Sequence, residues 1–371
     1  MKKKEKALSP LEIKMNAWVT AHLSRIPFVQ KIFFIEHLRT MVHAGISLVE
    51  ALSILEKELE NKKLRLLVGK IKTEVEQGTQ LSEALETYEE VFPHTYIKMV
   101  AAGELSGKLE ESLLQIETQM KKTHELTSTI RGAMIYPSVI LTAMLGVGVF
   151  MVIFVLPKLT ELFKEFDAEL PLATKILIGI TDFLSNPIYL TAIIITVIGF
   201  IFLFITLLKK QIGFQRAVHR MNLHIPIFGG VIKQINLARF SLTLSSLLKS
   251  AIPITEAISI TAETCTNVLY KEALLGATNK IQSGIPLSEI LTESPKLFPP
   301  IVTEMVMVGE RSGEVDQLLS ELSDFYGTAV DKTMKNFTTI IEPVIILTLG
   351  LAVGGMAVAV IMPMYSLMQN F

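Results

Sequence analysis

The sequence predicts an all-α protein that combines two tandem cytoplasmic helical bundles, of about six helices each, with three transmembrane helices. Hydrophobic residues make up 50% of its 371 residues and charged residues 19%. This balance is too apolar for a soluble protein and too charged for one that lies wholly within a bilayer. Three long uncharged stretches and an internal repeat at an offset of 206 residues account for the balance.

The uncharged stretches predict the membrane spans. Residues 138–156, 188–208 and 343–362 contain no charged side chain. At a rise of about 1.5 Å per residue, each is long enough as a helix to cross a hydrocarbon core of about 30 Å. The chain begins with "MKKKEK" and has no apolar core of a signal peptide before its first helix, so we expect no cleavage.

The distribution of charge around the spans predicts their orientation. Residues 157–187 carry three lysines and five acidic residues, whereas Lys209, Lys210, Arg216 and Arg220 follow the second span. Positively charged flanks stay in the cytoplasm. Both large regions are therefore predicted to be cytoplasmic in a cell inner membrane, with the C-terminus outside.

The repeat defines the architecture. At the offset of 206, "GTQLSEAL" (78–85) aligns with "GIPLSEIL" (284–291), and Pro137 at the start of the first span aligns with Pro343 at the start of the third. Each unit is thus a bundle followed by a span. The second span has no counterpart, because it returns the chain so that both bundles lie on the same side.

The apolar residues within a unit recur at steps of three and four, which indicates helices. The expected helices of the first unit are 31–44, 47–59, 62–76, 79–87, 93–102 and a long one from 107 toward the membrane, and the second unit repeats them 206 residues on. Before them, residues 11–26 form an amphipathic stripe that either lies on the inner leaflet or packs on its own bundle.

These observations give a predicted domain order. It is an N-terminal amphipathic segment (1–30), helical domain 1 (31–137), span 1 (138–158), an external loop (159–187), span 2 (188–208), helical domain 2 (209–342), span 3 (343–363) and an external tail (364–371).

One loop motif occurs in both units, as "GELSGKLE" (103–110) and "GERSGEVD" (309–316). It resembles a phosphate-binding loop, but its glycines are one residue too close, no hydroxyl follows the lysine and helices flank both sides. Nucleotide binding is therefore rejected in favour of a helix–turn–helix. In that interpretation Gly103 ends one helix in the left-handed conformation, and Ser106 caps the next.

The glutamate of the motif needs a separate explanation. Glu104 and Glu310 occupy matching positions in the turn and have no capping task there. One interpretation is a bond to nearby backbone amides. The other is a carboxylate offered to a basic surface of a partner.

The sequence contains no arrangement typical of catalysis, cofactor binding or metal binding. The single cysteine, Cys265, is expected to be a buried apolar residue. The spans hold no ionisable residue, which argues against a membrane carrier or channel and an intramembrane enzyme. A net charge of −1 gives no indication of nucleic-acid binding.

With these residues established, the chain resembles the type II secretion system F family, the polytopic platform proteins of type IV pilus and type II secretion machines. The resemblance rests on both Gly-Glu-x-Ser-Gly loops, "LFPPIVTEMVMVGERSGEV" (297–315) and "LPKLTELFKEFDAELPLATK" (156–175). It implies a non-enzymatic homo-oligomer that passes the motion of a cytoplasmic hexameric assembly ATPase to pilin or pseudopilin subunits. Other inner-membrane assembly components and membrane lipid are further implied partners.

Ten residues are the candidates for partner binding or for a hinge. They are Gly103, Glu104, Ser106, Gly107, Pro137, Gly309, Glu310, Ser312, Gly313 and Pro343. The two prolines are included because each removes one helical hydrogen bond where a bundle helix meets a span, which permits a kink.

Overall fold

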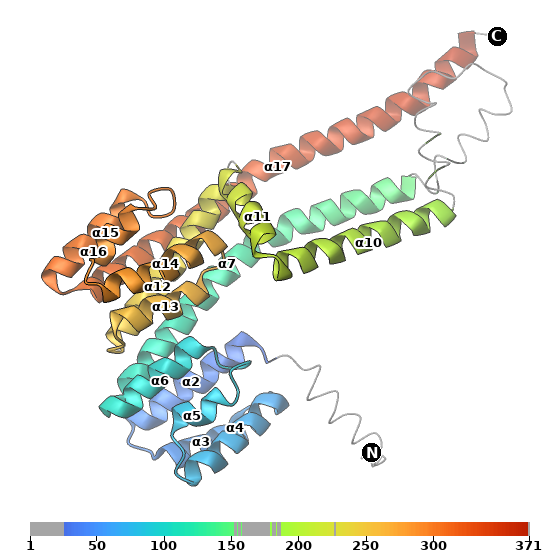
Figure 1. The fold of residues 1–371 in the computed structure, drawn as a ribbon. Coiled ribbons are helices and arrows are strands. Elements are labelled where there is room, and N and C mark those ends of the chain that lie inside the picture. Colours follow the sequence, from blue (N-terminus) through green and yellow to red (C-terminus); the bar gives the residue numbers. More distant parts are fainter. Residues whose placement is uncertain are drawn as a thin grey trace, which may run out of the picture. The chain divides into compact units, whose positions relative to one another are not determined.

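The computed structural model describes residues 26–151, 154, 157, 179, 183, 187–225 and 228–369. Every regular element within these ranges is a helix, as the fold class predicts (Figure 1). The N-terminal stripe before residue 26 and most of the predicted external loop lie outside the described residues. The division into cytoplasmic and external regions remains a prediction.

The first unit contains six helices. They are α2 (Phe28–His43), α3 (Leu48–Glu58), α4 (Lys62–Glu76), α5 (Leu81–Glu86), α6 (His94–Ser106) and α7 (Leu109–Phe150). After the second span, α10 (Pro187–Lys210), comes α11 (Ile212–His224). The second unit consists of α12 (Phe228–Lys249), α13 (Ile254–Thr264), α14 (Val268–Gln282), α15 (Leu287–Thr292), α16 (Pro300–Ser312) and α17 (Val315–Gln369).

The two units repeat with the predicted offset. Adding 206 to the bounds of α3, α4, α5 and α6 gives the bounds of α13, α14, α15 and α16 without any shift. The aromatic pair of the core repeats as well: the ring centroids of Phe34 and Phe92 lie 5.6 Å apart, and those of Phe240 and Phe298 lie 5.4 Å apart. All four rings are fully buried, so each unit has an apolar core of its own.

Local chemistry explains where the helices begin and end. Ser47 accepts a hydrogen bond from the backbone N–H of Glu50 and thereby caps α3. The preceding turn contains Gly45 with a φ of 78°, a conformation that a residue with a Cβ rarely adopts. The break between the predicted helices 31–44 and 47–59 is therefore confirmed.

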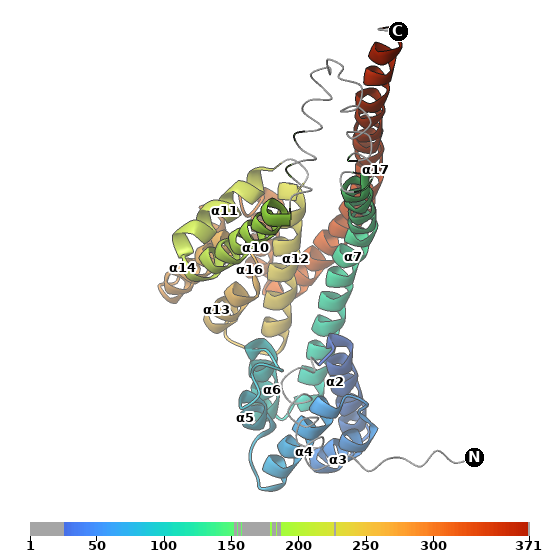
Figure 2. The same ribbon diagram turned by 90° about the vertical axis from the view of Figure 1, so that its right-hand side faces the viewer.

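The chain divides into two compact units of contact. One holds the described residues up to 127 and 232–328, which are the two bundles, and the other holds 128–231 and 329–369. Within the part of the chain that the structure describes, three helices have the length and composition to cross a membrane, within Leu109–Phe150, Thr191–Lys210 and Val315–Gly355. Both α7 and α17 run from a bundle into a span as one unbroken helix (Figure 2).

Candidate functional site

The repeated glutamate is the central residue of the loop motif, and it lies in the last turn of a helix rather than in the turn that follows. Glu104 Oε1 accepts a hydrogen bond of 2.6 Å from the backbone N–H of Leu81, and its Oε2 accepts one of 2.9 Å from that of Ser82. These two amides belong to the first turn of α5, whose N-cap residue Gln80 contributes no side-chain hydrogen bond. A carboxylate that is distant in sequence therefore caps this short helix.

The second unit makes the same contact. Glu310 Oε1 accepts from the backbone N–H of Leu287 at 2.6 Å, and its Oε2 accepts from the N–H of Ser288 at 3.3 Å and from the Ser288 hydroxyl at 2.5 Å. The interpretation as a bond to backbone amides is thus confirmed. The idea that this glutamate has no capping task is wrong, because its target helix begins more than twenty residues earlier in the chain.

The helix is ended by the second glycine of the motif and not by the first, as the sequence suggested for Gly103. Gly107 and Gly313, with φ of 68° and 80°, are the left-handed residues that end α6 and α16. Gly103 and Gly309 are helical and buried instead. The prediction that Gly103 ends the helix is wrong, since the turn closes four residues later.

The first glycine is needed for close packing. A Cβ at Gly103 would lie 2.5 Å from Ser112 Oγ, and a Cβ at Gly309 would lie 2.8 Å from the Cα of Val315. Both neighbours belong to the helix that follows the turn. The absence of a side chain therefore lets the two helices of the hairpin touch.

Ser106 does not cap the next helix. Its hydroxyl donates to the carbonyl of Ala102 at 2.7 Å, within its own helix α6. Ser312 also donates within its own helix, to the carbonyl of Gly309 three residues earlier, at 3.4 Å. Acidic residues of the motif do lie near the positive ends of the following helices, with Glu110 in the first turn of α7 and Asp316 in that of α17.

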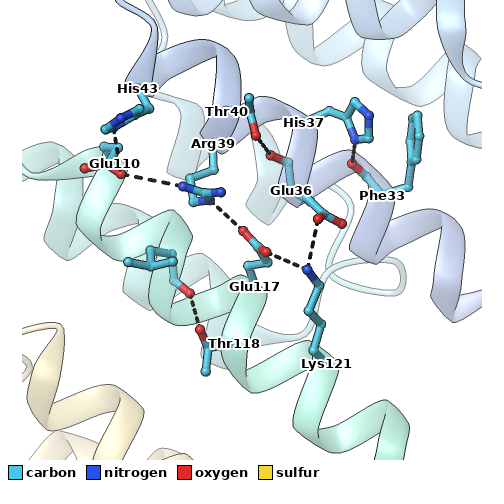
Figure 3. Close-up of polar contacts among 11 residues, drawn as sticks. Phe33, Glu36, His37, Arg39, Thr40, His43, Glu110, Glu117, Thr118 and Lys121 are labelled. Atoms are coloured by element: carbon cyan, nitrogen blue, oxygen red, sulfur yellow. Dashed lines mark hydrogen bonds and ion pairs between the residues drawn. The ribbon is translucent and has the colours of Figure 1, made fainter.

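A network of charged residues joins α2 to α7 in the first unit, and sequence reasoning missed it (Figure 3). Arg39 Nε lies 2.6 Å from Glu117 Oε2, and Lys121 Nζ lies 2.7 Å from Glu117 Oε1. Lys121 also pairs with Glu36 at 2.9 Å. The Glu117–Lys121 pair has the spacing of four that the sequence shows, but the contacts across the two helices have no sequence signal, because 78 residues separate Arg39 from Glu117 and 85 separate Glu36 from Lys121.

The matching positions of the second unit carry no such network. The counterpart of Glu117 is Ser323, and that of Arg39 is Ser245, whose hydroxyl donates to the carbonyl of Asp316 at 2.7 Å. The charged network is therefore specific to the first bundle. In that bundle, these ion pairs hold α2 against α7.

The network makes the stability of the first bundle dependent on pH. Burial alone would raise the pKa of Glu117, but hydrogen bonds from Lys121 and Arg39 outweigh it and lower the pKa below the ordinary 4.5. A carboxyl whose pKa is lowered on folding stabilises the protein above its unfolded pKa and loses that contribution as the pH falls. We expect the Glu117→Gln variant to be less stable than the parent chain at pH 7, with the difference shrinking below about pH 4.5.

Urea denaturation of the detergent-solubilised chain at a series of pH values measures this difference. Glu125, an exposed residue of the same helix, provides the control. A Glu125→Gln variant should track the parent chain at every pH. A Glu117→Gln deficit that stays constant into the acid range would contradict the assigned ion pairs.

The cysteine and the possible metal-binding groups provide no reactive site among the described residues. Cys265 is buried, and burial raises the pKa of its thiol to about 12, so it remains a neutral apolar residue as expected. Among the described residues, no group of three or more His, Cys, Asp or Glu side chains is placed to hold a metal ion.

The fold and motif together define a class of protein: a duplicated membrane module in which each bundle carries a short helix capped by the glutamate of the loop motif. The model of the type II secretion system protein F family matches the chain twice, over residues 34–157 and 240–363. These matches cover more than half of the chain and are themselves 206 residues apart. The chain therefore belongs to this family.

Characterised relatives are similar over most of the chain. It is 36% identical over 337 residues to the type IV pilus assembly protein PilC of Thermus thermophilus, covering 90% of this chain and 81% of that protein. Identity is 34% to the type IV pilus assembly protein TapC of Aeromonas hydrophila, covering 89% and 79% of the two chains. It is 29% to the type II secretion system protein F of Vibrio cholerae, covering 97% and 90%.

Proposed function

We propose that this chain is an inner-membrane platform protein that couples a cytoplasmic assembly ATPase to the assembly of pilin or pseudopilin subunits. The observation that carries the proposal is the match of the family model to both halves of the chain, each half with its own bundle and its own candidate span. The predicted cytoplasmic placement of both bundles puts them on the side where an ATPase has access to its nucleotide.

Type IV pilus assembly is favoured over type II secretion. The pilus assembly relatives are 29–36% identical to this chain, and the secretion relatives 27–29%. Deletion of the gene in the organism that encodes it should abolish surface pili, and the intact gene should restore them. Loss of protein secretion with pili retained would instead assign the chain to the secretion machinery.

The second bundle offers a surface for a partner. Thr95 and Gln119 in the first bundle are 6% and 3% exposed, and Gln119 donates to Thr243 of the second bundle at 3.3 Å. Their counterparts Ile301 and Phe325 are larger, apolar and 41% and 54% exposed. These two positions are therefore buried in the first bundle and exposed in the second, where they carry apolar side chains. Exposed apolar surfaces of this kind commonly bind other proteins.

We propose that each of the two prolines is a hinge through which force on a bundle tilts the span that follows it. Pro137 stands inside α7, and Pro343 stands at the matching position of α17. Alanine at both sites restores the missing hydrogen bonds and stiffens each helix. We expect the Pro137→Ala/Pro343→Ala double variant to insert normally but to assemble fewer pili.

Counting pili by electron microscopy, together with the amount of protein in the membrane, measures this effect. Pro300→Ala is the matched control, because Pro300 occupies the first position of α16, where proline removes no helical hydrogen bond. Normal piliation in the double variant would exclude a hinge at these prolines.

A further inference from the structure

The two bundles contact each other through different faces of the repeated unit. Gln119 of α7 donates to Thr243 of α12 at 3.3 Å, and Lys98 of α6 lies 3.9 Å from Glu256 of α13. The α6/α7 face of the first bundle therefore lies against the α12/α13 face of the second. The repeat equivalent of Gln119 is Phe325 and not Thr243, so the contact joins two unlike faces and is head-to-tail.

A head-to-tail contact inside one chain leaves one copy of each face uncovered. On the second bundle, the uncovered copy is the α16/α17 face, which consists of Ile301, Glu304, Val308 and Phe325. Its apolar members Ile301, Val308 and Phe325 are 41%, 54% and 54% exposed. Asp324, which pairs with Lys122 of the first bundle, points about 100° around α17 from Phe325, so this ion pair does not cover the face.

On the first bundle, the uncovered copy is the α2/α3 face, which consists of Phe33, His37, Thr40 and Glu50. The rings of Phe33 and His37 stack on α2 with their centroids 3.7 Å apart (Figure 3). His37 is half-buried and Thr40 is exposed. Their equivalents in the second bundle, Thr243 and Ser246, are only 3% and 5% exposed.

Both uncovered faces are more apolar than the covered faces to which they correspond. In the contact inside the chain, Gln119 of one face meets Thr243 of the other. The same positions of the uncovered faces carry Phe325 and His37, and Phe33 stands where the second bundle has an arginine. Aromatic side chains are enriched at the centres of protein interfaces. The two uncovered faces therefore match each other, with aromatic side chains at the positions of the polar contact.

We propose that the α16/α17 face of one chain binds the α2/α3 face of a second copy, in the same arrangement as the two bundles within a chain. Phe325 of one copy then packs on the stacked rings of Phe33 and His37 of the other. Because the two faces differ, the contact is head-to-tail, and each added copy again presents an uncovered face. The proposal does not depend on the pilus function, because it follows from the repeat and from the contact between the bundles.

The charged positions at the edge of the proposed contact act against it. Lys98 and Glu256, the ion pair inside the chain, correspond to Glu304 and Glu50, so two carboxylates face each other between the copies. The side chains of Lys98 and Glu256 remain 37% and 46% exposed, and interactions between exposed charges contribute little to binding. The like charges therefore weaken the association without preventing it.

Cross-linking in membranes tests the contact. Full-length chains with His37→Cys and full-length chains with Phe325→Cys, each with a different affinity tag, are expressed together, and isolated membranes are treated with a short bismaleimide. The native Cys265 is buried and does not compete. We expect a cross-linked dimer that carries both tags. Neither variant should cross-link when it is expressed alone, because the contact joins unlike faces.

Two further pairs are the controls. Gln119→Cys and Thr243→Cys in one chain should cross-link within that chain, since this pair marks the contact between the bundles. Glu86→Cys, expressed with Phe325→Cys, should give no dimer, because Glu86 is an exposed residue of α5, which lies on the other side of the first bundle from α2 (Figure 2). Absence of the mixed dimer, an equal yield with Glu86→Cys, or failure of the pair within the chain would overturn the proposal.

The dissociation constant of the detergent-solubilised chain, from sedimentation equilibrium, gives a second test. Phe325→Gln, which places the residue of the covered face on the uncovered one, should weaken the association about tenfold. Glu304→Lys should strengthen it about threefold, because it removes a like charge and recreates the ion pair found inside the chain. Glu86→Lys should change nothing. Unchanged association of Phe325→Gln, or weaker association of Glu304→Lys, would overturn the proposal.

Discussion

Replacing both repeated glutamates should give one of the two largest losses of stability available in this chain. Each carboxylate accepts hydrogen bonds from two backbone amides of a short helix, α5 or α15. Hydrogen bonds to a charged group each contribute about 1.5–3 kcal/mol, and their removal leaves the amides without partners. We therefore expect Glu104→Ala and Glu310→Ala each to lower the free energy of unfolding by about 2–3 kcal/mol.

The two sites lie in different bundles and share no partner, so their effects should add to within about 0.5 kcal/mol. Urea denaturation of the solubilised chain, followed by circular dichroism, gives the free energies. Glu104→Gln should show an intermediate loss, because glutamine keeps one acceptor oxygen for one of the two amides. Glu86→Ala, which removes an exposed carboxylate at the end of α5, is the control. A double variant as stable as that control would show that the carboxylates do not cap these helices.

The second large effect is expected at the buried glycines of the hairpins. A methyl group at Gly309 would lie 2.8 Å from the Cα and 3.2 Å from the backbone nitrogen of Val315. Main-chain atoms cannot rotate away as a side chain can, so the two helices must separate. We expect Gly309→Ala to destabilise the chain by about 3 kcal/mol, the upper part of the usual range for overpacking.

Gly276→Ala is the matched control, because Gly276 is also helical, lies in the same bundle and has open space around it. That substitution should stabilise the chain by about 0.5–1 kcal/mol, since alanine is the better helix former. Differential scanning calorimetry of both variants separates the effects by sign. Equal shifts in Tm would contradict the close approach of α16 and α17.

The periodicity of apolar residues and the repeat were sufficient to predict the fold. Helix bounds such as 62–76 were predicted without error because apolar periodicity and capping residues act over a few positions. Helix α6 extends four residues beyond its predicted end at 102. The reason is that its glycine at 103 is required for packing, and a sequence pattern cannot distinguish a packing glycine from a terminating one.

The site was less predictable because its contacts span long distances along the chain. The bonds of Glu104 reach back 22 and 23 residues, and the Arg39–Glu117 pair spans 78. The repeat did contain a usable signal: the same Leu-Ser dipeptide precedes the same glutamate by the same interval in both units. Residue pairs that recur at a fixed interval in both copies are candidates for contact, and this comparison needs no other sequence.

The twofold occurrence of the glutamate cap also bears on the history of the chain. The two bundles have diverged until an ion network in one has become serines in the other, yet both keep the same carboxylate on the same pair of amides. The simplest descent is that a single ancestral gene already encoded this bond before it was copied and fused. A present-day protein with only one such module should then still contain the glutamate and the Leu-Ser pair at the same spacing.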